Sequence, residues 1–232
     1  MGSQQSALEK LGMSLMQKEK SFLVFGSNGE IGRAVFAALE DEATVFQGAR
    51  NLRELESNTE FFGVLNGVVW AQGMNVSDSI NSQNSNYGPV LEANVSFIIE
   101  SLKVLLEKGK IAPGANLLII GSIWGQFARP EKLSYMVSKS AVLGLVRSLA
   151  IDLAHMGVQV NAISPGPIDT EMTKSHLTSS QLDRIISETP LKRLVTLQEV
   201  AAIIYAFLSG KLGGVTGQEI VIDGGWSVSK LV

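Results

Sequence analysis

The sequence predicts an α/β fold, in which a single doubly wound parallel sheet carries helices on both of its faces. Two patterns predict it. Short runs that are apolar at nearly every position recur along the 232 residues, as expected for strands that are covered on both faces. Stretches with apolar residues at helical spacing alternate with these runs, and such alternation is typical of a parallel sheet.

Each element follows from its own pattern. Strands are expected at residues 21–25, 43–46, 67–71, 115–120, 158–163 and 219–222, where the apolar runs lie. Helices are expected at residues 30–39, 88–106, 134–155 and 196–208, where apolar residues recur every three or four positions. Residues 1–20 are expected to form a leader with a short helix, because apolar residues recur there at helical spacing. Residues 21–232 are expected to form one domain.

Composition excludes several kinds of site. The chain has no cysteine and only two histidines, which excludes disulfide scaffolds and thiolate zinc sites, and no metal site is expected. Nineteen basic and 22 acidic residues give a net charge of −3, so a nucleic-acid partner is not expected. No run suits a membrane span or a signal peptide, so we expect no membrane partner and a cytoplasmic location.

A glycine-rich segment follows the first expected strand directly. It reads Gly26-Ser27-Asn28-Gly29-Glu30-Ile31-Gly32 and opens an apolar helix. Glycines at this spacing permit a tight turn and let the backbone approach a pyrophosphate, while the helix N-terminus presents free N–H groups. The segment therefore predicts a Rossmann-type dinucleotide site. The alternative is a glycine-rich turn selected for packing alone.

The residues after the second expected strand indicate which dinucleotide is preferred. A carboxylate here would hydrogen-bond a free ribose 2′-hydroxyl and favour NAD. Residues 47–51 hold no Asp or Glu but do hold Arg50, and a guanidinium pairs well with a 2′-phosphate. We therefore expect NADP(H) to be preferred, with NAD(H) as the alternative. Arg50 is otherwise an ordinary exposed charge at a helix start.

A tyrosine and a lysine four residues apart open the helix expected at 134–155. Tyr135 and Lys139 lie one turn apart on the same helix face. A free phenol has a pKa near 10, and a neighbouring ammonium group is expected to lower it towards the range of efficient proton transfer. Such a pair alone is common in proteins. A catalytic interpretation is favoured because Ser122 follows an apolar strand, at the edge where parallel sheets bind ligands.

Together these segments resemble the short-chain dehydrogenase/reductase family over nearly the whole chain. The matching segments, in the order of the family, are the glycine loop at 26–32, Ala71-Gln72-Gly73, Asn94, Ser122, Tyr135, Lys139, residues 161–170, residues 215–218 and Asp223-Gly224-Gly225. The resemblance implies an oxidoreductase that interconverts a carbonyl and a secondary alcohol by hydride transfer. It also implies a dimer or tetramer formed through the two long central helices, and a homotetramer is expected here.

The resemblance implies a role for each matching residue. Tyr135 would exchange a proton with the substrate oxygen, Ser122 would polarise the same carbonyl, and Lys139 would bind the nicotinamide ribose and tune Tyr135. Asn94 would hold a water molecule that relays protons. Residues 170–195 would form a substrate lid. The implied cofactor contacts are Gly26, Ser27, Asn28, Gly29, Ile31, Gly32, Arg50, Ala71, Gly73, Tyr135, Lys139, Pro165, Gly166, Ile168 and Thr170.

The chain departs from the family on the adenine side of the expected site. Trp70-Ala71-Gln72-Gly73 lacks both asparagines of the family's N-N-A-G motif, and Glu30 stands where the family has a glycine. The family places a helix, a strand and another helix between the positions of Arg50 and Ala71. A parallel crossover alone needs a dozen or more residues, so the region between the family's second and fourth strands is expected to be shortened.

Several functions remain open from the sequence. Within enzymes, the substrate is a 3-oxoacyl thioester or a sugar or other polar metabolite. A second class is a catalytically idle nucleotide-binding sensor or scaffold, and a third is a structural interaction protein that binds no dinucleotide. The complete set of Ser122, Tyr135 and Lys139 favours the enzyme.

Overall fold

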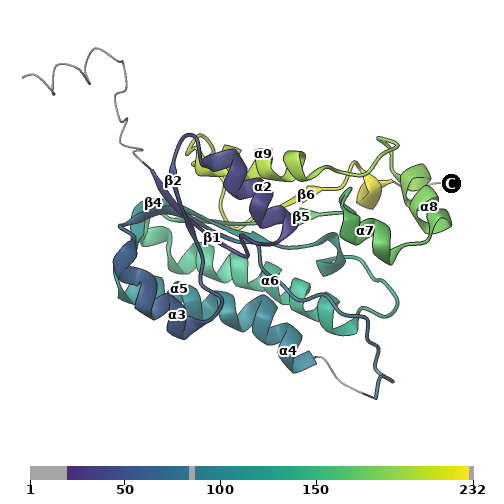
Figure 1. Ribbon diagram of the computed structural model, residues 1–232, viewed down its shortest axis with the longest axis horizontal. Coiled ribbons are helices and arrows are strands. Elements are labelled where there is room, and N and C mark those ends of the chain that lie inside the picture. The colour runs from purple at the N-terminus through teal and green to yellow at the C-terminus, as the bar shows by residue number, and fades with distance from the viewer. Residues whose placement is uncertain (1–19, 84–86, 230–232) are drawn as a thin grey trace, which may run out of the picture.

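The computed structural model describes residues 20–83 and 87–229 (Figure 1), so the helix expected in the leader lies outside the described residues. One sheet of six parallel strands runs in the order β2-β1-β3-β4-β5-β6. The strands are β1 (Ser21–Phe25), β2 (Thr44–Gln47), β3 (Leu65–Trp70), β4 (Ile111–Ile120), β5 (Gln159–Pro165) and β6 (Glu219–Ile222). Each expected strand is present to within a few residues, and the predicted fold class is confirmed.

Helices cover both faces of this sheet. The described helices are α2 (Glu30–Leu39), α3 (Leu52–Asn58), α4 (Tyr87–Leu91), α5 (Phe97–Glu107), α6 (Leu133–Asp152), α7 (Glu171–His176), α8 (Ser179–Glu188) and α9 (Leu197–Leu208). Figure 1 shows α2 and α9 on one face and α3, α5 and α6 on the other. The helix expected at 88–106 is divided, because a π-helical turn, η2 (Glu92–Ser96), separates α4 from α5.

The two-sided cover explains why the central strands are apolar at most positions. Leu23 and Phe25 of β1 belong to the core that packs against α3, α5 and α6. Phe22 and Val24, which point the other way, belong to the core that packs against α2 and α9. Successive side chains of a strand point to opposite faces of the sheet. In a strand that lies between two layers of helices, the side chains on both faces are therefore buried and mostly apolar.

The connection between β2 and β3 is shortened, as expected. A single helix, α3, and the short 3₁₀ turn η1 (Thr59–Phe61) make the whole crossover. A doubly wound dinucleotide fold commonly has the strand order 3-2-1-4-5-6, with another strand outside the second. Here β2 is the outermost strand at that edge among the described residues, so the outer strand is the element that the short connection omits.

The strand order places a crevice at the carboxyl end of β1. From β1 the chain moves to one side to form β2 and then crosses back to form β3 on the other side. Open α/β sheets bind ligands at such a reversal of strand order. Across residues 20–83 and 87–229, no helix combines the length and the apolar character that crossing a membrane requires.

Candidate active site

The glycine loop joins β1 to α2 by a turn that only small residues permit. Gly26 has φ +72°, and a Cβ at this position would lie 2.5 Å from the backbone nitrogen of Gln72. A Cβ at Gly32 would overlap the carbonyl oxygen of Gly26. The loop is therefore packed directly against the segment that follows β3, while Asn28 and Gly29 are exposed.

The N-terminus of α2 faces the crevice. Its N-cap, Gly29, donates its N–H to the Gly26 carbonyl (2.9 Å) and has no side chain that could satisfy the first N–H groups of the helix. Free N–H groups and the positive end of the helix dipole are what a pyrophosphate requires, so the loop fits a dinucleotide. The next residues, Glu30 and Ile31, line the cavity described below, and the Glu30 carboxylate lies at the positive end of the helix dipole, whose charge it partly neutralises.

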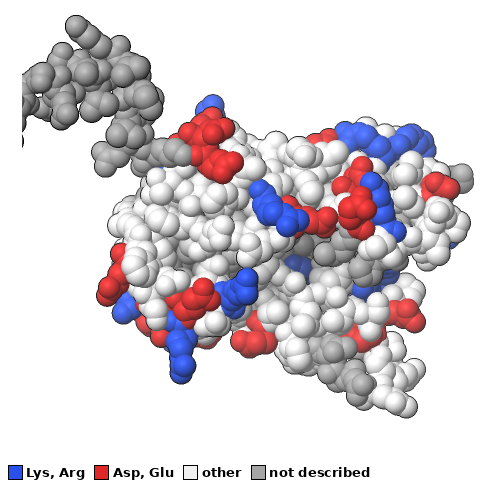
Figure 2. All heavy atoms as spheres, in the orientation of Figure 1, with Lys and Arg blue, Asp and Glu red and all other residues white. Residues whose placement is uncertain are grey.

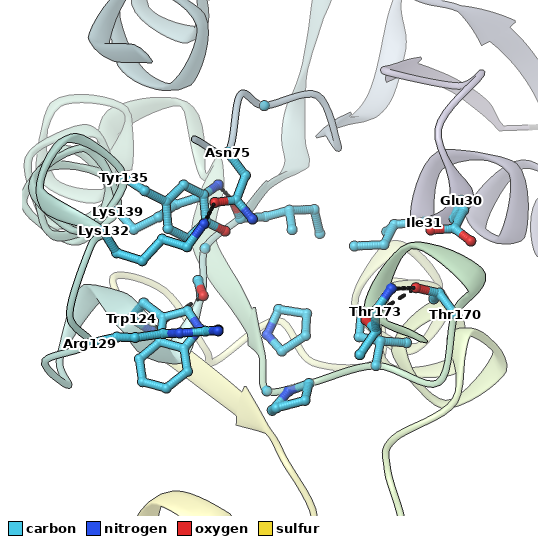
Figure 3. A pocket seen from close by; sticks show the side chains of 18 of the residues that line it. Glu30, Ile31, Asn75, Trp124, Arg129, Lys132, Tyr135, Lys139, Thr170 and Thr173 are labelled. Carbon is cyan, nitrogen blue, oxygen red and sulfur yellow. Dashed lines mark hydrogen bonds between the residues drawn. The ribbon is translucent and has the colours of Figure 1, made fainter. Parts of the chain in front are cut away.

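One cavity of about 660 Å³ joins this helix start to the residues that were expected to be catalytic. The ends of β3, β4 and β5 and the first turns of α2 and α6 form its walls. Predicted site residues that line it are Ile31, Gly73, Ser122, Tyr135, Lys139, Pro165, Gly166, Ile168 and Thr170. In Figure 3, Tyr135 and Lys139 lie on the side opposite Glu30, Ile31 and Thr170.

Ser122, Tyr135 and Lys139 meet in this cavity. Ser122 follows β4, and its hydroxyl is hydrogen-bonded to that of Tyr135 in the first turn of α6. Lys139, one turn further along α6, is buried and donates from Nζ to the carbonyl oxygen of Ile120 (2.7 Å). Its Nζ lies 5.7 Å from the centroid of the Tyr135 ring. The spacing of the three residues in the sequence thus produces one compact polar cluster.

The pKa values of this cluster differ in part from the expectation. Burial raises the pKa of Tyr135, and the hydrogen bond with Ser122 offsets part of that rise. Burial lowers the pKa of Lys139 to about 8. The expectation that Lys139 lowers the pKa of Tyr135 is wrong for this structure, because loss of solvent around the phenol dominates and the opposing effect comes from Ser122.

Asn94 lies in the π-helical turn η2 and joins two parts of the site. Its Oδ1 accepts from the Met74 N–H (2.6 Å), while its Nδ2 donates to the Met74 carbonyl and to Oγ of Ser138 (both 2.9 Å). Ser138 in turn donates to the carbonyl oxygen of Tyr135 (2.7 Å). The side chain therefore ties the segment after β3 to the catalytic turn of α6. Single π-helical turns are frequent at functional sites.

The segment after β5 forms the wall opposite α6. Gly166 donates its N–H to the Ile222 carbonyl (2.9 Å), and a Cβ at Gly166 would lie 2.6 Å from that of Asp223. Ile168 pairs with Val195, and the Thr170 side chain caps α7 by accepting from the Thr173 N–H (3.1 Å). The backbone of this wall is thus fixed before the chain enters α7 and α8.

Some predicted cofactor residues lie outside the cavity walls. Ala71 donates its N–H to the Phe25 carbonyl (3.0 Å) and holds the end of β3 against β1. Arg50 is exposed, and its backbone N–H donates to the carboxylate of Glu54 (3.0 Å). Ser27 is buried within the glycine loop. The Arg50 side chain is therefore at the surface beside the edge strand β2, where the outer strand is absent.

Asp78 is a site residue that the sequence reasoning missed. The N-cap of α6 is Lys132, whose side chain has no acceptor. The buried Asp78 carboxylate caps the helix instead, because it accepts hydrogen bonds from the Ser134 N–H (3.0 Å) and from the Ser134 hydroxyl. Asp78 also pairs with the chain at Glu131 and Leu133 through its backbone. The available signal was that Asp78 is the one carboxylate in the polar segment 75–86.

Trp124, Arg129 and Lys132 also line the cavity. From the sequence, Trp124 was a candidate for the substrate pocket or for packing, while Arg129 and Lys132 were not predicted. They belong to the segment between Ser122 and α6, where the sequence shows no regular spacing. On the face shown in Figure 2, acidic and basic side chains are both present over the described residues. In the part of the chain that the structure describes, no group of three or more His, Asp or Glu residues could hold a metal ion.

Known proteins share this sequence and fold. The family model described as enoyl-(acyl carrier protein) reductase matches residues 53–227. A 3-oxoacyl-(acyl-carrier-protein) reductase FabG of Buchnera aphidicola subsp. Baizongia pistaciae is 32% identical over 63% of this chain, a match that spans 59% of that relative's own length. Glucose 1-dehydrogenase 2 of Bacillus subtilis is 28% identical over 90% of this chain and 80% of its own.

Solved structures agree with these matches. A short chain dehydrogenase family protein from Francisella tularensis has a TM-score of 0.80 and 26% identity, over 90% of this chain and 99% of its own. A 3-oxoacyl-(acyl-carrier protein) reductase from Brucella melitensis, solved in complex with NAD, has a TM-score of 0.79 and 23% identity, over 91% of this chain and 98% of its own. The family model covers well over half of the chain, and its residues include the cluster of Ser122, Tyr135 and Lys139. The chain belongs to the short-chain dehydrogenase/reductase family.

Proposed function

We propose that the chain is an NADP(H)-dependent oxidoreductase that interconverts a carbonyl and a secondary alcohol by hydride transfer. The observation that carries the proposal is the hydrogen bond between Ser122 and Tyr135 beside a buried Lys139, in a cavity that reaches the start of α2. These side chains place two hydroxyl donors and one cation around a single point. Such an arrangement suits proton transfer to an oxygen on which negative charge develops.

Each member of the cluster has a distinct task in this proposal. Tyr135 gives its proton to the carbonyl oxygen during reduction and takes it back during oxidation. The raised pKa of Tyr135 keeps the phenol protonated, which suits the acid role. Ser122 donates to the same oxygen and holds it near the phenol. The Lys139 ammonium, whose pKa is about 8, stabilises the phenolate that forms and binds the nicotinamide ribose.

Asn94 is proposed to support a proton relay to solvent through one water molecule. Its side-chain amide makes three hydrogen bonds, with Met74 and Ser138, so the second lone pair of Oδ1 and the backbone carbonyl are the acceptors that would hold the water. Gly73 lies directly beside it, since a Cβ there would come 3.1 Å from Asn94 Oδ1 and 3.7 Å from Lys139 Nζ.

When bound, the nicotinamide cofactor supplies the hydride. The glycine loop and the N-terminus of α2 would hold the pyrophosphate through backbone N–H groups, and the wall after β5 would hold the nicotinamide. The residues assigned to it are Gly26, Ser27, Asn28, Gly29, Ile31, Gly32, Ala71, Gly73, Tyr135, Lys139, Pro165, Gly166, Ile168 and Thr170. The close packing of Gly26 against Gln72 and of Gly32 against Gly26 supports this assignment.

The preference for NADP(H) over NAD(H) is assigned to Arg50. Its side chain is exposed beside β2, where a 2′-phosphate on the adenosine ribose would lie. Related structures have been solved with either cofactor: ElxO with NADP bound, at 23% identity, and the Brucella melitensis reductase with NAD. Among the described residues no strand lies outside β2, and Arg50 is the charged group that we assign to this end of the cofactor.

Substrate class and assembly are also proposals. Relatives named as 3-oxoacyl-carrier-protein reductases and as a glucose dehydrogenase support a thioester and a polar metabolite respectively. We place the protein in a dimer or tetramer formed through α5 and α6. Exposed apolar side chains on these helices support this, with Ile151 78% and Val137 40% exposed on α6 and Ile99 41% exposed on α5.

A catalytically idle nucleotide-binding protein is the second candidate, and the loss of the outer strand beside β2 favours it. Two measurements separate the candidates. Titration with NADPH and NADH raises the Tm of any protein that binds them, by mass action. Loss of NADPH absorbance in the presence of a panel of aldehydes, ketones and oxo acids then reports turnover. Binding with turnover supports the oxidoreductase, and binding without turnover of any member supports the idle module.

A further inference from the structure

The wall of the cavity next to Tyr135 is built by the segment between Ser122 and α6. Three large side chains of this segment, Trp124, Arg129 and Lys132, line the cavity. Figure 3 shows Trp124, Arg129 and Lys132 on the same side as Tyr135, with Glu30 and Thr170 across the cavity from them. The residues around the reacting end are thus separated from those at the start of α2, where the pyrophosphate would bind.

Arg129 is a half-buried cation without a charged partner. Its guanidinium lies over the Trp124 ring, 5.5 Å from the centroid. Its side chain has no hydrogen-bond or ion-pair partner among the residues that the structure describes; only its backbone N–H is engaged, with Sδ of Met136. A guanidinium that stacks on an aromatic face keeps the N–H groups at its edge free to bind an anion.

Lys132 is a second cation held at the same wall by neutral groups. Its Nζ donates to Oδ1 of Asn75 (2.8 Å) and to the carbonyl oxygen of Val76 (3.0 Å), which leaves one N–H free. Burial, and then the charge of Arg129, lower the pKa of Lys132, while Asp78 and Glu131 act in the opposite direction. Both cations are half-buried, and both line the cavity.

The two carboxylates near these cations, Asp78 and Glu131, do not line the cavity. Asp78 already accepts two hydrogen bonds from Ser134 at the start of α6. Among the described residues that line the cavity, Glu30 is the one carboxylate, and it lies at the opposite end. A half-buried cation with no carboxylate facing it in the cavity is stabilised when an anion pairs with it. An anionic ligand in the cavity would supply the charged partner that these two cations lack.

We infer that the carbonyl substrate carries a small oxyanion, a carboxylate or a phosphate, which Arg129 and Lys132 bind while Ser122 and Tyr135 hold the carbonyl oxygen. The inference rests on the proposed function and narrows it towards polar, anionic metabolites and away from long acyl thioesters. Trp124 positions the Arg129 guanidinium, and Asn75 with Val76 positions the Lys132 ammonium.

Matched substrate pairs test this inference. One arm compares straight-chain 2-, 3-, 4- and 5-oxo acids with their methyl esters, and a second arm compares ketose phosphates with the free ketoses. In the pair with the larger ratio, the wild-type protein is expected to have a kcat/KM at least about tenfold higher for the anionic member than for the neutral one. A factor of this size is what one charge-assisted hydrogen bond contributes. The arm with the larger ratio identifies the oxyanion as carboxylate or phosphate.

Variants assign the preference to the two cations. Arg129→Gln and Lys132→Gln are expected to lose about tenfold or more in kcat/KM for the anionic member and to keep their activity on the neutral one. Arg129→Lys is expected to keep part of the preference for the anionic substrate, because it keeps the positive charge but loses the planar guanidinium that binds an oxyanion with two hydrogen bonds. Lys211→Gln, which removes one charge from an exposed turn after α9, is the matched control. Equal kcat/KM for both members of every pair, or equal losses on both in Arg129→Gln, overturns the inference.

A binding measurement keeps this result separate from the proposed function. Malonate, which holds no reducible carbonyl, is titrated into the wild-type protein and into Arg129→Gln with no cofactor present, and the Tm is recorded. A rise in the Tm of the wild-type protein that Arg129→Gln lacks supports the anion site even if no carbonyl compound is reduced. Equal shifts in the two proteins contradict the site even if carbonyl compounds are reduced.

Discussion

The carboxylate of Asp78 holds the backbone N–H and the hydroxyl of Ser134, the residue directly before Tyr135. Asp78 comes from the polar loop after β3, so a residue far from α6 in the sequence fixes the first turn of that helix. Lys132 at the N-cap position lacks an acceptor, and the cap is supplied through a tertiary contact instead. The position of the Tyr135 hydroxyl therefore depends on the loop as well as on the helix.

Asp78→Ala is expected to lower the free energy of unfolding by about 1–3 kcal/mol, because it removes a helix cap and leaves buried donors unpaired. It is also expected to lower kcat more than it raises KM, because the phenol is displaced from the reacting oxygen. Urea unfolding and steady-state kinetics measure the two effects. Asp78→Asn keeps one acceptor and should recover part of both. Loss of stability with unchanged kcat would show that the cap does not position Tyr135.

Gly32→Ala is expected to weaken cofactor binding severely, because the added Cβ overlaps the carbonyl of Gly26 and must displace the glycine loop. A calorimetric titration with NADPH measures the loss. Gly63→Ala is the matched control, since a Cβ there meets nothing within 4 Å, and its stability should change by no more than about 0.5 kcal/mol. Equal NADPH affinity in Gly32→Ala and the wild-type protein would argue against the loop as the pyrophosphate site.

Arg50→Gln tests the choice of cofactor. Removing the guanidinium is expected to raise the Kd for NADPH by about tenfold and to leave the Kd for NADH unchanged, because a charge-assisted pair with the 2′-phosphate is lost. Raising the salt concentration should reduce the difference in the Kd for NADPH between the wild-type protein and the variant, because salt screens the charge of the exposed Arg50 side chain. A parallel loss for both cofactors would contradict selection by Arg50.

The burial of Lys139 makes stability depend on pH in a defined direction. The pKa of Lys139 falls from 10.5 to about 8 in the folded protein, so between these values the unfolded chain binds more protons than the folded chain. The free energy of unfolding therefore rises with pH across this window, by at most about 3 kcal/mol from this group. The free energy of unfolding in urea is measured as a function of pH, from pH 7 upward through this window, for the wild-type protein and for Lys139→Met. The difference between the two proteins isolates the effect of Lys139 from that of other lysines. Parallel curves for the two proteins would contradict the lowered pKa.

The sheet could be predicted from the sequence because its signals are local. The run from Phe22 to Phe25 is apolar at every position, and the structure buries its side chains in two cores on opposite faces. The shortened crossover was predicted from the few residues between Arg50 and Ala71, and the structure omits the outer strand there. The helix α3 in that interval was not predicted, although Asn51 caps it by accepting from the Glu54 N–H.

The site could be predicted only where its residues act through regular spacing. Tyr135 and Lys139 share a helix face, so the sequence places them together. Asp78 acts through hydrogen bonds with Ser134 in another segment, and Arg129 stacks on the ring of Trp124. Neither contact follows from a periodic pattern in the sequence. The rise in the pKa of Tyr135 was missed for a similar reason, because burial is a property of the assembled cavity.

Tyr135→Phe tests the central claim most directly, because it removes one hydroxyl and keeps the ring. NADPH consumption with the best carbonyl substrate is compared between the variant and the wild-type protein, and the Kd for NADPH is measured in parallel. The proposed role predicts a loss of about 10²–10⁴-fold in kcat, the range of general acid–base catalysis, with a Kd for NADPH close to that of the wild type. A kcat near that of the wild-type protein would contradict Tyr135 as the proton donor.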